Sequence, residues 1–558
     1  MKRGFTLIEL LAVITILSII VLIASVSLSN VLKDSKEDLS NSQITAIKEA
    51  AKSWSSDNMD ILPSGNNCSF LTLKDLKEDG LIDEEIIDPK DKKNISNDLK
   101  IKIESKMNGA GNSNLTYEVN PDSIKDCLYI GSDMYVDLPK GLTPVIYDGT
   151  NWKVPKENEE WYNYDKLMWA NAVVLGSGKT KKPGEIVTVE GENPDALMML
   201  VYIPRYEYKI EGKYGTHTDG TEGTAALPGE IEVKFINNSK IAADDGYILH
   251  PAFTFDGEKS GFWVAKFELS HSDETKSETS LECTTDACSE AQYLRILPNK
   301  ASLRGNDVSN FFYAIRSIEK TNTFGISNMD THMMKNSEWG AVAYLSQSKY
   351  GKYGNSDYEN RYKEVYQNKS SEYITGSSNG TPSQEEYREG GQCTYKDVTN
   401  LGVDGDNYKM GLCGPGASTT GNIYGVYDMS GGAFEYVMGA YGPEYPTIKE
   451  SGFTSDDIFS SGKIDSKYYD VYANATSGSN DGSQSCNNGI CYGHGISETS
   501  NWYTDTRYMV YSTYPWFVRG GRYDKTTGSG VFYRSIYDGI GDVNSYGNFS
   551  TRAVSFAK

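Results

Sequence analysis

Residues 4–14 read GFTLIELLAVI, and the apolar run that they begin continues to about Leu32, with Glu9 as its only charge. A helix from Phe5 to Leu32 would be about 42 Å long at 1.5 Å per residue, which exceeds the ~30 Å hydrocarbon core of a bilayer. Two basic residues precede the run, so the positive-inside bias keeps the N-terminus in the cytoplasm and exports the rest. The sequence therefore predicts one membrane-spanning helix, over residues 5–30.

A cleavable secretory signal is the alternative interpretation of this segment. The apolar region of such a signal is about 7 to 15 residues long and ends at a small-residue cleavage site, and neither property fits the sequence. The carboxylate also needs an explanation, because Glu9 inside an apolar helix is costly unless it finds a cation.

Gly4, the string FTLIE and the long apolar helix together resemble the N-terminal motif of type IV pilins and pseudopilins, and the match extends over residues 4–20. The resemblance implies that a prepilin peptidase removes residues 1–4, that the new terminus Phe5 is N-methylated, and that the chain assembles with other pilin subunits. In that family the glutamate that Glu9 matches pairs with the terminal amine of a neighbouring subunit. This pairing would supply the missing cation.

The composition is that of an acidic, multidomain protein. A chain of 558 residues is longer than one hydrophobic core usually supports. Its 54 Lys and Arg against 76 Asp and Glu give a net charge of −22, without a basic stripe that could follow phosphates, so no nucleic-acid partner is expected. The 54 Gly and 40 Tyr are typical of many turns and short strands, so we expect an α+β fold.

The eight cysteines fall into neighbouring pairs along the chain, a pattern that favours disulfides in an exported protein. Metal binding is the alternative, but no pair has the two-residue gap of a zinc knuckle. We expect neither a metal nor another cofactor. The predicted disulfides are Cys68–Cys127, Cys283–Cys288, Cys393–Cys413 and Cys486–Cys491.

A looser helical period continues from about residue 31 to residue 57. Its expected inward positions are Leu39, Ile44, Ile47, Ala51 and Trp54. Beyond it, a helix start at 71–76 and extended stretches at 99–104 and 115–119 precede the second cysteine. We interpret residues 31–138 as a pilin-like spine and small α+β head, and a turn-rich connector near Pro139 as the boundary to a large unit over 139–558.

Five strings of the large unit occur in a recognisable order. They are MLVYIP (199–204), GFWVAKFE (261–268), SEWGAVAY (337–344), GVYDMSGGAFEYV (425–437) and VRGG (518–521). In order and spacing these strings resemble two early strands, the central helix, the most recognisable element and a late strand of the formylglycine-generating-enzyme-like branch of the C-type lectin fold.

The chain departs from that family at four positions. Gly432 replaces the usual Asn, Phe434 and Tyr436 replace two Trp, and Arg522 replaces a Ser. Phe434 and Tyr436 alternate with Glu435, as expected for a half-buried strand, and the preceding glycine pair supplies a turn. The resemblance therefore implies a retained core with an altered surface.

The sequence predicts no catalysis. Oxidases of the resembled family need a cysteine pair near the C-terminus, and its iron enzymes need clustered histidines. Here the last cysteine is Cys491, and the five histidines are scattered without metal-ligand spacing. We assign no catalytic residue and expect that the protein is not an enzyme. Calcium-dependent sugar binding is not predicted either, because the sugar-binding loop of C-type lectins is absent.

The segment over 522–548 mixes Tyr, Ser, Asp, Asn and Gly, as adaptable binding loops do. In position and composition it resembles the variable region of ligand-binding proteins diversified by retroelements. A solvated loop with a few core aromatics is an equally weighted alternative. The residues expected to line a ligand surface are Tyr523, Asp524, Tyr533, Tyr537, Asp538, Asn544 and Tyr546, together with Trp502 and Trp516.

We therefore expect a minor or tip-like pilin that carries an adhesin head, first as a single-pass membrane protein and then at the cell surface or in a pilus, with most of its mass outside the cell. The ligand would be a glycan, a protein or a phage. Two alternatives remain. One is a pseudopilin of a type II secretion or DNA-uptake machine with a structural head, and the other is a surface-tethered enzyme.

Overall fold

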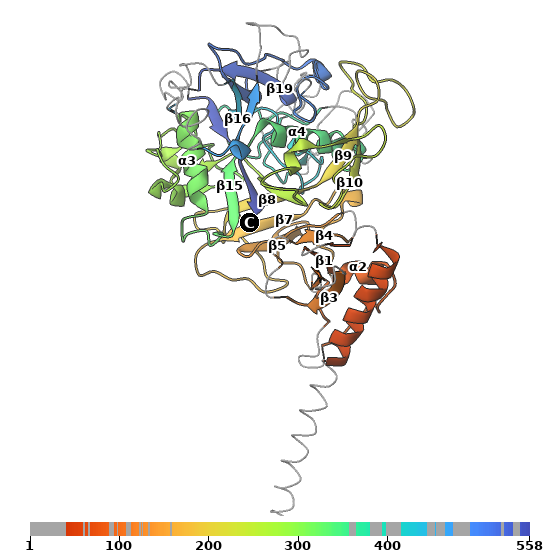
Figure 1. The fold of residues 1–558 in the computed structure, drawn as a ribbon. Helices are drawn as coiled ribbons and strands as arrows, with labels where there is room; N and C mark the ends of the chain where they lie inside the picture. Colours follow the sequence, from red (N-terminus) through yellow and green to blue (C-terminus); the bar gives the residue numbers. More distant parts are fainter. Residues whose placement is uncertain are drawn as a thin grey trace, which may run out of the picture. The chain divides into compact units, whose positions relative to one another are not determined.

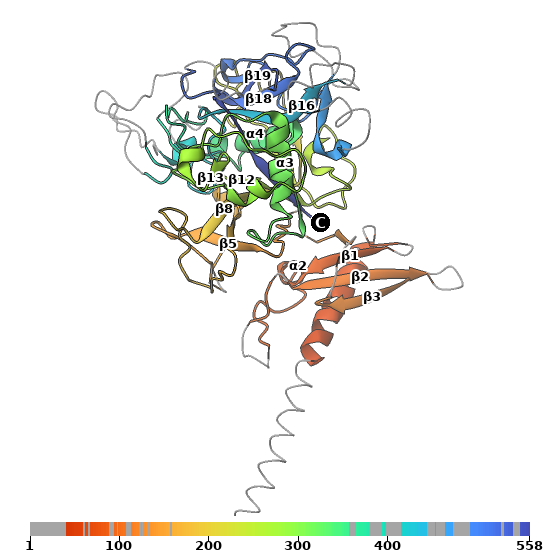
Figure 2. The ribbon, with the colours of Figure 1, turned by 90° about the vertical axis from the view of Figure 1, so that its left-hand side faces the viewer.

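A computed structural model of the chain shows two compact units, Met1–Ser132 and Asp133–Lys558, called here the small unit and the large unit (Figures 1 and 2). The structure describes residues 41–59, 62–64, 67–88, 94–97, 99–107, 113–121, 124, 127–131, 134–156, 159–355, 364–379, 393–397, 414–442, 452–453, 464–472, 491–525, 529–539 and 547–558.

A helix over 41–57 packs on a four-stranded sheet in the small unit. Three of the predicted inward positions, Ile47, Ala51 and Trp54, are buried in its core. Ile44, one turn earlier, is 39% exposed, so the buried stripe begins at Ile47, and Leu39 lies outside the described residues. The sheet has the order β3-β2-β1-β4, with β1 (Cys68–Thr72), β2 (Lys100–Met107), β3 (Ser113–Val119) and β4 (Leu128–Tyr129).

Helix α2 (Leu73–Glu78) begins later than the predicted start at 71–76, because Leu71 and Thr72 complete β1. Thr72 then caps the helix: its N–H donates to Asp75 Oδ2 (2.7 Å), and the Asp75 N–H donates to Thr72 Oγ1 (3.3 Å). The two predicted extended stretches are confirmed as β2 and β3.

Two of the predicted disulfides are present, one in each unit: Cys68–Cys127 and Cys283–Cys288. Cys393 and Cys491 are also disulfide-bonded. The remaining two cysteines, Cys413 and Cys486, lie outside the described residues.

The boundary between the units falls at Ser132 and Asp133, a few residues before the connector expected near Pro139. The residues just before Pro139 already belong to the large unit. Val136 is part of its core, and Trp263 Nε1 donates to the Asp137 carbonyl at 2.8 Å.

A seven-stranded sheet with the order β15-β21-β12-β8-β7-β5-β6 forms the base of the large unit. Strand β21 reaches the C-terminus and pairs antiparallel with both β12 and β15, so the last residues of the chain lie inside the sheet. The strings expected as early strands are β8 and β12, which pair with each other. The strands are β5 (Leu142–Tyr147), β6 (Trp152–Lys153), β7 (Asn171–Leu175), β8 (Ala196–Pro204), β12 (Gly261–Ala265), β15 (Met329–Met333) and β21 (Ala553–Ala557).

Two helices of the large unit pack against its strands. Helix α3 (Val308–Ile318) packs on β15, and α4 (Asn336–Ser346), the helix expected at 337–344, packs against β16 and β19 (Figures 1 and 2). Every residue of α4 is buried, and a Cβ on Gly340 would collide with the Gly493 carbonyl. This helix is therefore enclosed on all sides.

A second sheet is formed by strands between residues 434 and 551. Its strand order is β17-β16-β18-β19, and β20 pairs parallel with β16. Its strands are β16 (Phe434–Tyr441), β17 (Asp470–Tyr472), β18 (Trp516–Gly520), β19 (Gly530–Tyr537) and β20 (Phe549–Thr551). The glycine pair before β16 has φ values of +78° and +72°, which confirms the predicted turn.

Shorter elements complete the described fold, which is α+β and mostly sheet. The strands are β9 (Tyr206–Lys209), β10 (Glu232–Phe235), β11 (Ile248–Leu249), β13 (Ser270–His271) and β14 (Leu294–Arg295). The 3-10 turns are Tyr164–Lys166, Pro251–Phe253, Glu274–Lys276, Ser289–Tyr293, Lys352–Gly354, Pro415–Ala417, Ser466–Tyr468 and Trp502–Thr504. Among the described residues no helix has the length and apolarity to cross a membrane. The predicted span over 5–30, with Gly4, Phe5 and Glu9, lies outside them.

Candidate ligand-binding face

The segment with the predicted ligand residues forms the β18–β19 hairpin and the chain on either side of it (Figure 2). The register shifts between Arg519 and Gly520, and Gly520 and Gly521 both have φ of +79°, a region that favours glycine. A Cβ on Gly521 would collide with Ser529, so the two ends of the connecting loop meet closely. The start of the loop therefore has a backbone conformation that favours glycine.

Three predicted ligand residues lie in the core, which corrects the prediction for them. Trp502 and Trp516 are fully buried, and Tyr533 is 4% exposed. The Trp502 ring packs edge-on against Phe532 with centroids 5.3 Å apart. Large aromatic rings stabilise a fold most when they leave water, and these three do so.

Four other predicted residues reach the surface. Asp524 is exposed, and Tyr523, Tyr537 and Asp538 are partly exposed. Arg522 Nε donates to Asp524 Oδ1 at 2.7 Å, and this bond is the main reason why the pKa of Asp524 lies below its usual range. The remaining two, Asn544 and Tyr546, lie outside the described residues.

Aromatic rings connect these positions along the hairpin. Phe434 lies 6.0 Å from Tyr533 and 5.6 Å from Tyr537, measured between ring centroids. The Arg522 guanidinium lies 5.8 Å from the centre of the Phe434 ring. Tyr537 also packs edge-on against Phe549 at 4.5 Å. The exposed residues therefore stand on a rigid aromatic layer.

Sequence reasoning missed a second group of surface tyrosines beside β19. Tyr508 is 38% exposed and Tyr514 is 39% exposed. Their segment lies along the strand, because the Tyr508 N–H donates to the Arg534 carbonyl at 3.2 Å. The sequence has three tyrosines at a three-residue spacing over 508–514, and this pattern could have indicated the group. We call Tyr508, Tyr514, Tyr523, Asp524 and Tyr537 the ligand face.

Strand β16 is buried on both sides, so the prediction of a half-buried strand is wrong. Glu435 is fully buried because Arg552, from beyond β20, binds it with two hydrogen bonds of 2.7 and 3.0 Å. Burial raises the pKa of Glu435 to about 7, although Arg552 opposes the shift. The same guanidinium donates to the Ala265 carbonyl on β12, so this pair joins the two sheets.

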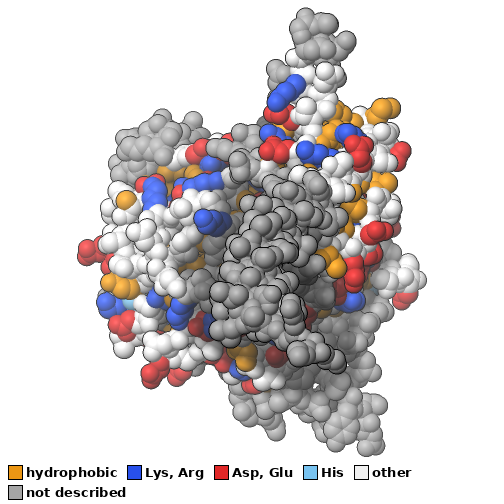
Figure 3. Space-filling model, turned by 90° about the horizontal axis from the view of Figure 1, so that it is seen from below, with side chains coloured by type: hydrophobic (Ala, Val, Ile, Leu, Met, Phe, Trp, Pro, Cys, Tyr) orange, Lys and Arg blue, Asp and Glu red, His pale blue; other side chains and the backbone are white. Residues whose placement is uncertain are grey.

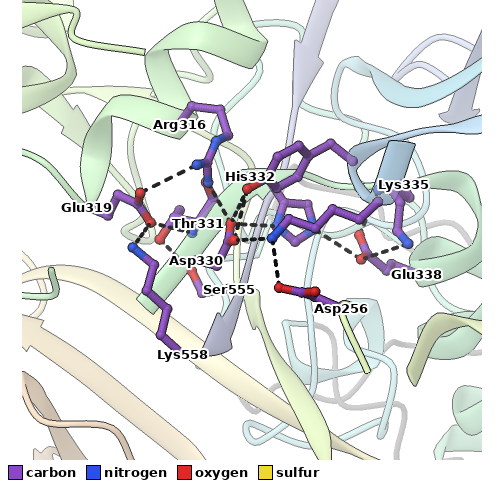
Figure 4. A network of polar contacts seen from close by, with 12 residues as sticks. Asp256, Arg316, Glu319, Asp330, Thr331, His332, Lys335, Glu338, Ser555 and Lys558 are labelled. Atoms are coloured by element: carbon purple, nitrogen blue, oxygen red, sulfur yellow. Dashed lines mark hydrogen bonds and ion pairs between the residues drawn. The ribbon is translucent and has the colours of Figure 1, made fainter. Parts of the chain in front are cut away.

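A larger polar network joins α3, β15 and α4 (Figure 4). Asp330 on β15 is its centre: Arg316 NH1 donates to Asp330 Oδ1 at 2.6 Å, and Lys467 Nζ lies 3.1 Å from Asp330 Oδ2. Burial alone would raise the pKa of Asp330, but His332, Arg316 and Lys467 hold it below its usual range. The network is therefore a structural anchor that requires an ionised carboxylate.

His332 and Glu338 come together in this network, with Nε2 and Oε1 3.0 Å apart. The His332 ring is fully buried and packs against Phe255 and Phe556, with centroid distances of 4.8 and 5.8 Å. A histidine and a carboxylate at this distance resemble a general acid–base pair, but burial removes them from contact with a substrate.

Among the described residues, one group brings three ligand-type side chains together: Cys283, Cys288 and Glu290. Its two sulfur atoms form the second disulfide, so they are not free to ligate a metal. A pocket of about 380 Å³ in the large unit lies between residues 176–181 and 322–325. Its Lys181 ammonium is paired with Asp195 at 2.7 Å, and none of the ligand face lines it.

Charged side chains are mixed on the face of the molecule seen in Figure 3, where Lys and Arg of the described residues are interspersed with Asp and Glu. Exposed ion pairs such as Lys234 and Asp244, 3.0 Å apart, also occur on the surface of the large unit. Such mixing favours solubility over the binding of a polyanion.

Comparison with known proteins adds evidence at the N-terminus. A family model described as the prokaryotic N-terminal methylation motif matches residues 1–25. No curated protein matches the chain. Among solved structures, the Major Tropism Determinant P3c and I1 variants align at 11% identity over 82% of this chain and 95% of theirs, with a TM-score of 0.24. A TM-score of this size supports no conclusion about fold or ligand.

The functional assignment therefore rests on the methylation motif. It implies processing by a prepilin peptidase and assembly with other pilins. It also implies a protein that is first anchored in the membrane and later located at the surface of a pilus or a related assembly.

Proposed function

We propose that the chain is a minor or tip-like type IV pilin that displays a ligand-binding head at the cell surface. The observation that carries the proposal is the methylation motif matched over residues 1–25, which precedes a large, separately folded unit. A head of this size would crowd subunits whose spine helices pack side by side, which favours a minor subunit over the main one.

We assign the large unit to the formylglycine-generating-enzyme-like branch of the C-type lectin fold. The support is that five strings which resemble this family form, in order, β8, β12, α4, the turn with β16, and β18. Each string has the type of element that the family has at that place. The buried pair Glu435 and Arg552 joins the seven-stranded sheet of this unit to the sheet that contains β16.

The ligand site of the proposed head is the ligand face, which belongs to the β18–β19 hairpin and to the segment over 508–514 that precedes it. Exposed tyrosines combine contact area with a hydroxyl group and lose little conformational entropy on binding. They stand beside β18 and β19, which carry the buried arginines Arg519 and Arg534. A rigid support under an adaptable surface is what a recognition site needs.

We also propose that the head binds its ligand without a chemical reaction. Of the histidine–carboxylate pairs among the described residues, His332 and Glu338 lie closest together, and both are fully buried.

Binding is tested with whole filaments carrying Tyr508→Ser and Tyr514→Ser, probed on immobilised glycans, on whole bacterial cells and with a phage library. The proposal expects that the wild-type filaments retain one class of probe and that the double variant loses most of this retention. Tyr293→Ser is the matched control, since Tyr293 is 43% exposed and does not belong to the ligand face. Equal retention by the wild type and the double variant would exclude this face as the site.

A further inference from the structure

A buried segment at residues 364–368 fastens the loop between β18 and β19, and we call it the brace. Gln367 is fully buried. Its Nε2 lies within hydrogen-bonding distance of the Arg522 carbonyl (2.9 Å), the Lys525 carbonyl (2.7 Å) and Ser529 Oγ (3.0 Å). One side-chain amide therefore holds both ends of the loop that carries Tyr523 and Asp524.

The next residue joins the brace to the core. The Asn368 N–H donates to the Ser430 carbonyl, and the Asn368 carbonyl accepts from the Gly432 N–H, both at 2.8 Å. Asn368 Nδ2 donates to Asp428 Oδ1 at 2.9 Å. The brace thus connects the ligand loop to the glycine turn that starts β16.

At its other end the brace places the buried carboxyl of Glu364 close to the buried carboxyl of Asp505. A Cβ on Gly530, the first residue of β19, would collide with Glu364 Oε1 and lie 2.5 Å from Asp505 Oδ2, so both oxygens crowd one point. Neither oxygen accepts a hydrogen bond from an N–H or O–H of the described residues. Two ionised carboxylates that both approach this point would repel each other strongly.

The segment that leads to Asp505 stores backbone strain. Asn501, Tyr503 and Thr504 have φ values of +70°, +53° and +62°, in the left-handed region that side chains with a Cβ rarely adopt. Strain of this kind persists only while its surroundings hold it. Here the Tyr503 hydroxyl donates to Gln347 Oε1 at 2.8 Å, and the Asp505 N–H donates to the Trp502 carbonyl at 3.1 Å.

We propose that Glu364 and Asp505 share a proton that keeps the brace closed, and that loss of this proton loosens the loop and regulates the ligand face. This inference rests on the proposed function only in giving the loop a ligand. The proton lies between one oxygen of each carboxyl, and ionisation of both leaves two negative charges against Gly530.

The neighbouring charges determine the sign of the pH dependence. Lys352 faces Glu364, and Arg519 and Arg534 face Asp505, while the hydroxyls of Tyr503 and Tyr533 lie close to the pair. Burial, reinforced by Asp505, raises the pKa of Glu364 well above its usual value, and burial raises the pKa of Asp505 in spite of the two arginines.

A raised pKa means that the closed brace is fully stabilised below the ordinary carboxyl pKa of about 4 and weakens as the pH rises toward the pKa of the closed pair. In that window opening releases one proton, so the opening equilibrium rises by up to about tenfold per pH unit. The loop should therefore be more open at neutral and alkaline pH than in acid.

The test measures amide hydrogen exchange of the peptide over 522–534 in the full-length protein in detergent, between pH 5 and pH 8, after correction for intrinsic exchange. Wild-type protein is compared with Glu364→Gln, whose amide can donate to Asp505 and has no proton to lose. We expect protection in the wild type to fall by at least about tenfold over this range, whereas the variant stays within about twofold. The same pH dependence in both proteins would overturn the proposal.

Glu372→Gln is the matched control, because this carboxylate is exposed and lies eight residues beyond Glu364. It should behave like the wild type. If Glu364→Gln also lowers protection in β8, the comparison is repeated with Asp505→Asn, and a loop that keeps the wild-type pH response in this variant contradicts the proposal. The measurement involves neither filament nor ligand, so a negative result would not affect the proposed function. In the same way, a negative result in the binding test would not affect the proposal of a shared proton in the brace.

Discussion

Asp330 and Glu364 are both buried carboxyls of the large unit, but their surroundings are opposite. Asp330 is enclosed by Arg316, Lys467 and His332, and these neighbours lower its pKa. Glu364 faces a second carboxyl, Asp505, and burial raises its pKa. The first site requires a negative charge to keep its cations paired, whereas the second requires a proton.

The large unit therefore contains one carboxyl site that anchors the fold and another that responds to pH. The network at Asp330 ties β15 to α3, far along the chain from the hairpin, and it loses stability only as the pH falls through a low pKa. The pair at Glu364 lies against the first residue of β19 and loses stability as the pH rises. A head with both should keep its core through the pH range in which its ligand loop changes.

The largest effect is expected at the pair that joins the two sheets. Arg552→Met leaves Glu435 buried without its partner, and we expect a loss of about 3–5 kcal/mol in the free energy of unfolding of the large unit, measured by denaturant titration. The double variant Glu435→Met with Arg552→Met should lose clearly less, because it removes Glu435 together with its hydrogen-bonded partner. Equal losses in both variants would contradict the account of this pair as a matched buried charge.

A smaller effect is expected at the anchoring network. Asp330→Asn removes the charge that Arg316 and Lys467 require, and it should cost about 2–3 kcal/mol at pH 7. Because the pKa of Asp330 is lowered, its contribution is present above the ordinary pKa of Asp and is lost as the pH falls, so the difference between variant and wild type should shrink toward pH 3. A difference that grows in acid would show that the sign is wrong.

The opposite and smaller effect is expected at the shared proton. Glu364→Gln should stabilise the large unit by about 1 kcal/mol at pH 8 and leave it nearly unchanged at pH 5, as measured by thermal unfolding at both values. A stabilisation that is larger at pH 5 would remove the distinction between the two clusters.

The smallest effect on stability is expected at the ligand face. Tyr514→Ser changes a side chain that is 39% exposed, and surface changes of this kind alter the free energy of unfolding by less than about 0.5 kcal/mol. Unfolding curves of this variant should overlay those of the wild type. A loss above about 1 kcal/mol would place Tyr514 among the packing residues and weaken its assignment to the ligand face.

Some elements were predicted well. The strands at 199–204 and 261–268 and the helix at 337–344 were expected from the resemblance to a known family, whereas the glycine pair before β16 itself predicted its turn. The two disulfides seen within the described residues followed from spacing alone. These features depend on residues that are close together in the sequence.

The site was harder to predict, because its contacts join distant segments. Glu435 finds Arg552 across 117 residues, and Glu364 finds Asp505 from a separate segment, so neither pairing leaves a local pattern. Trp502 and Trp516 were assigned to a surface because composition does not distinguish an anchoring aromatic in a loop from one in a core. Tyr508 is exposed because β19 covers the other side of the segment to which Tyr508 belongs.

Mass spectrometry of protein recovered from sheared filaments tests the central claim most directly. The account predicts an N-terminal peptide that begins at Phe5 and carries one added methyl group, with residues 1–4 absent. It further predicts that Glu9→Ala protein inserts into the membrane and is missing from the filaments. Recovery of assembled protein with an intact Met1, or of normal amounts of the Glu9→Ala variant in filaments, would contradict the pilin assignment.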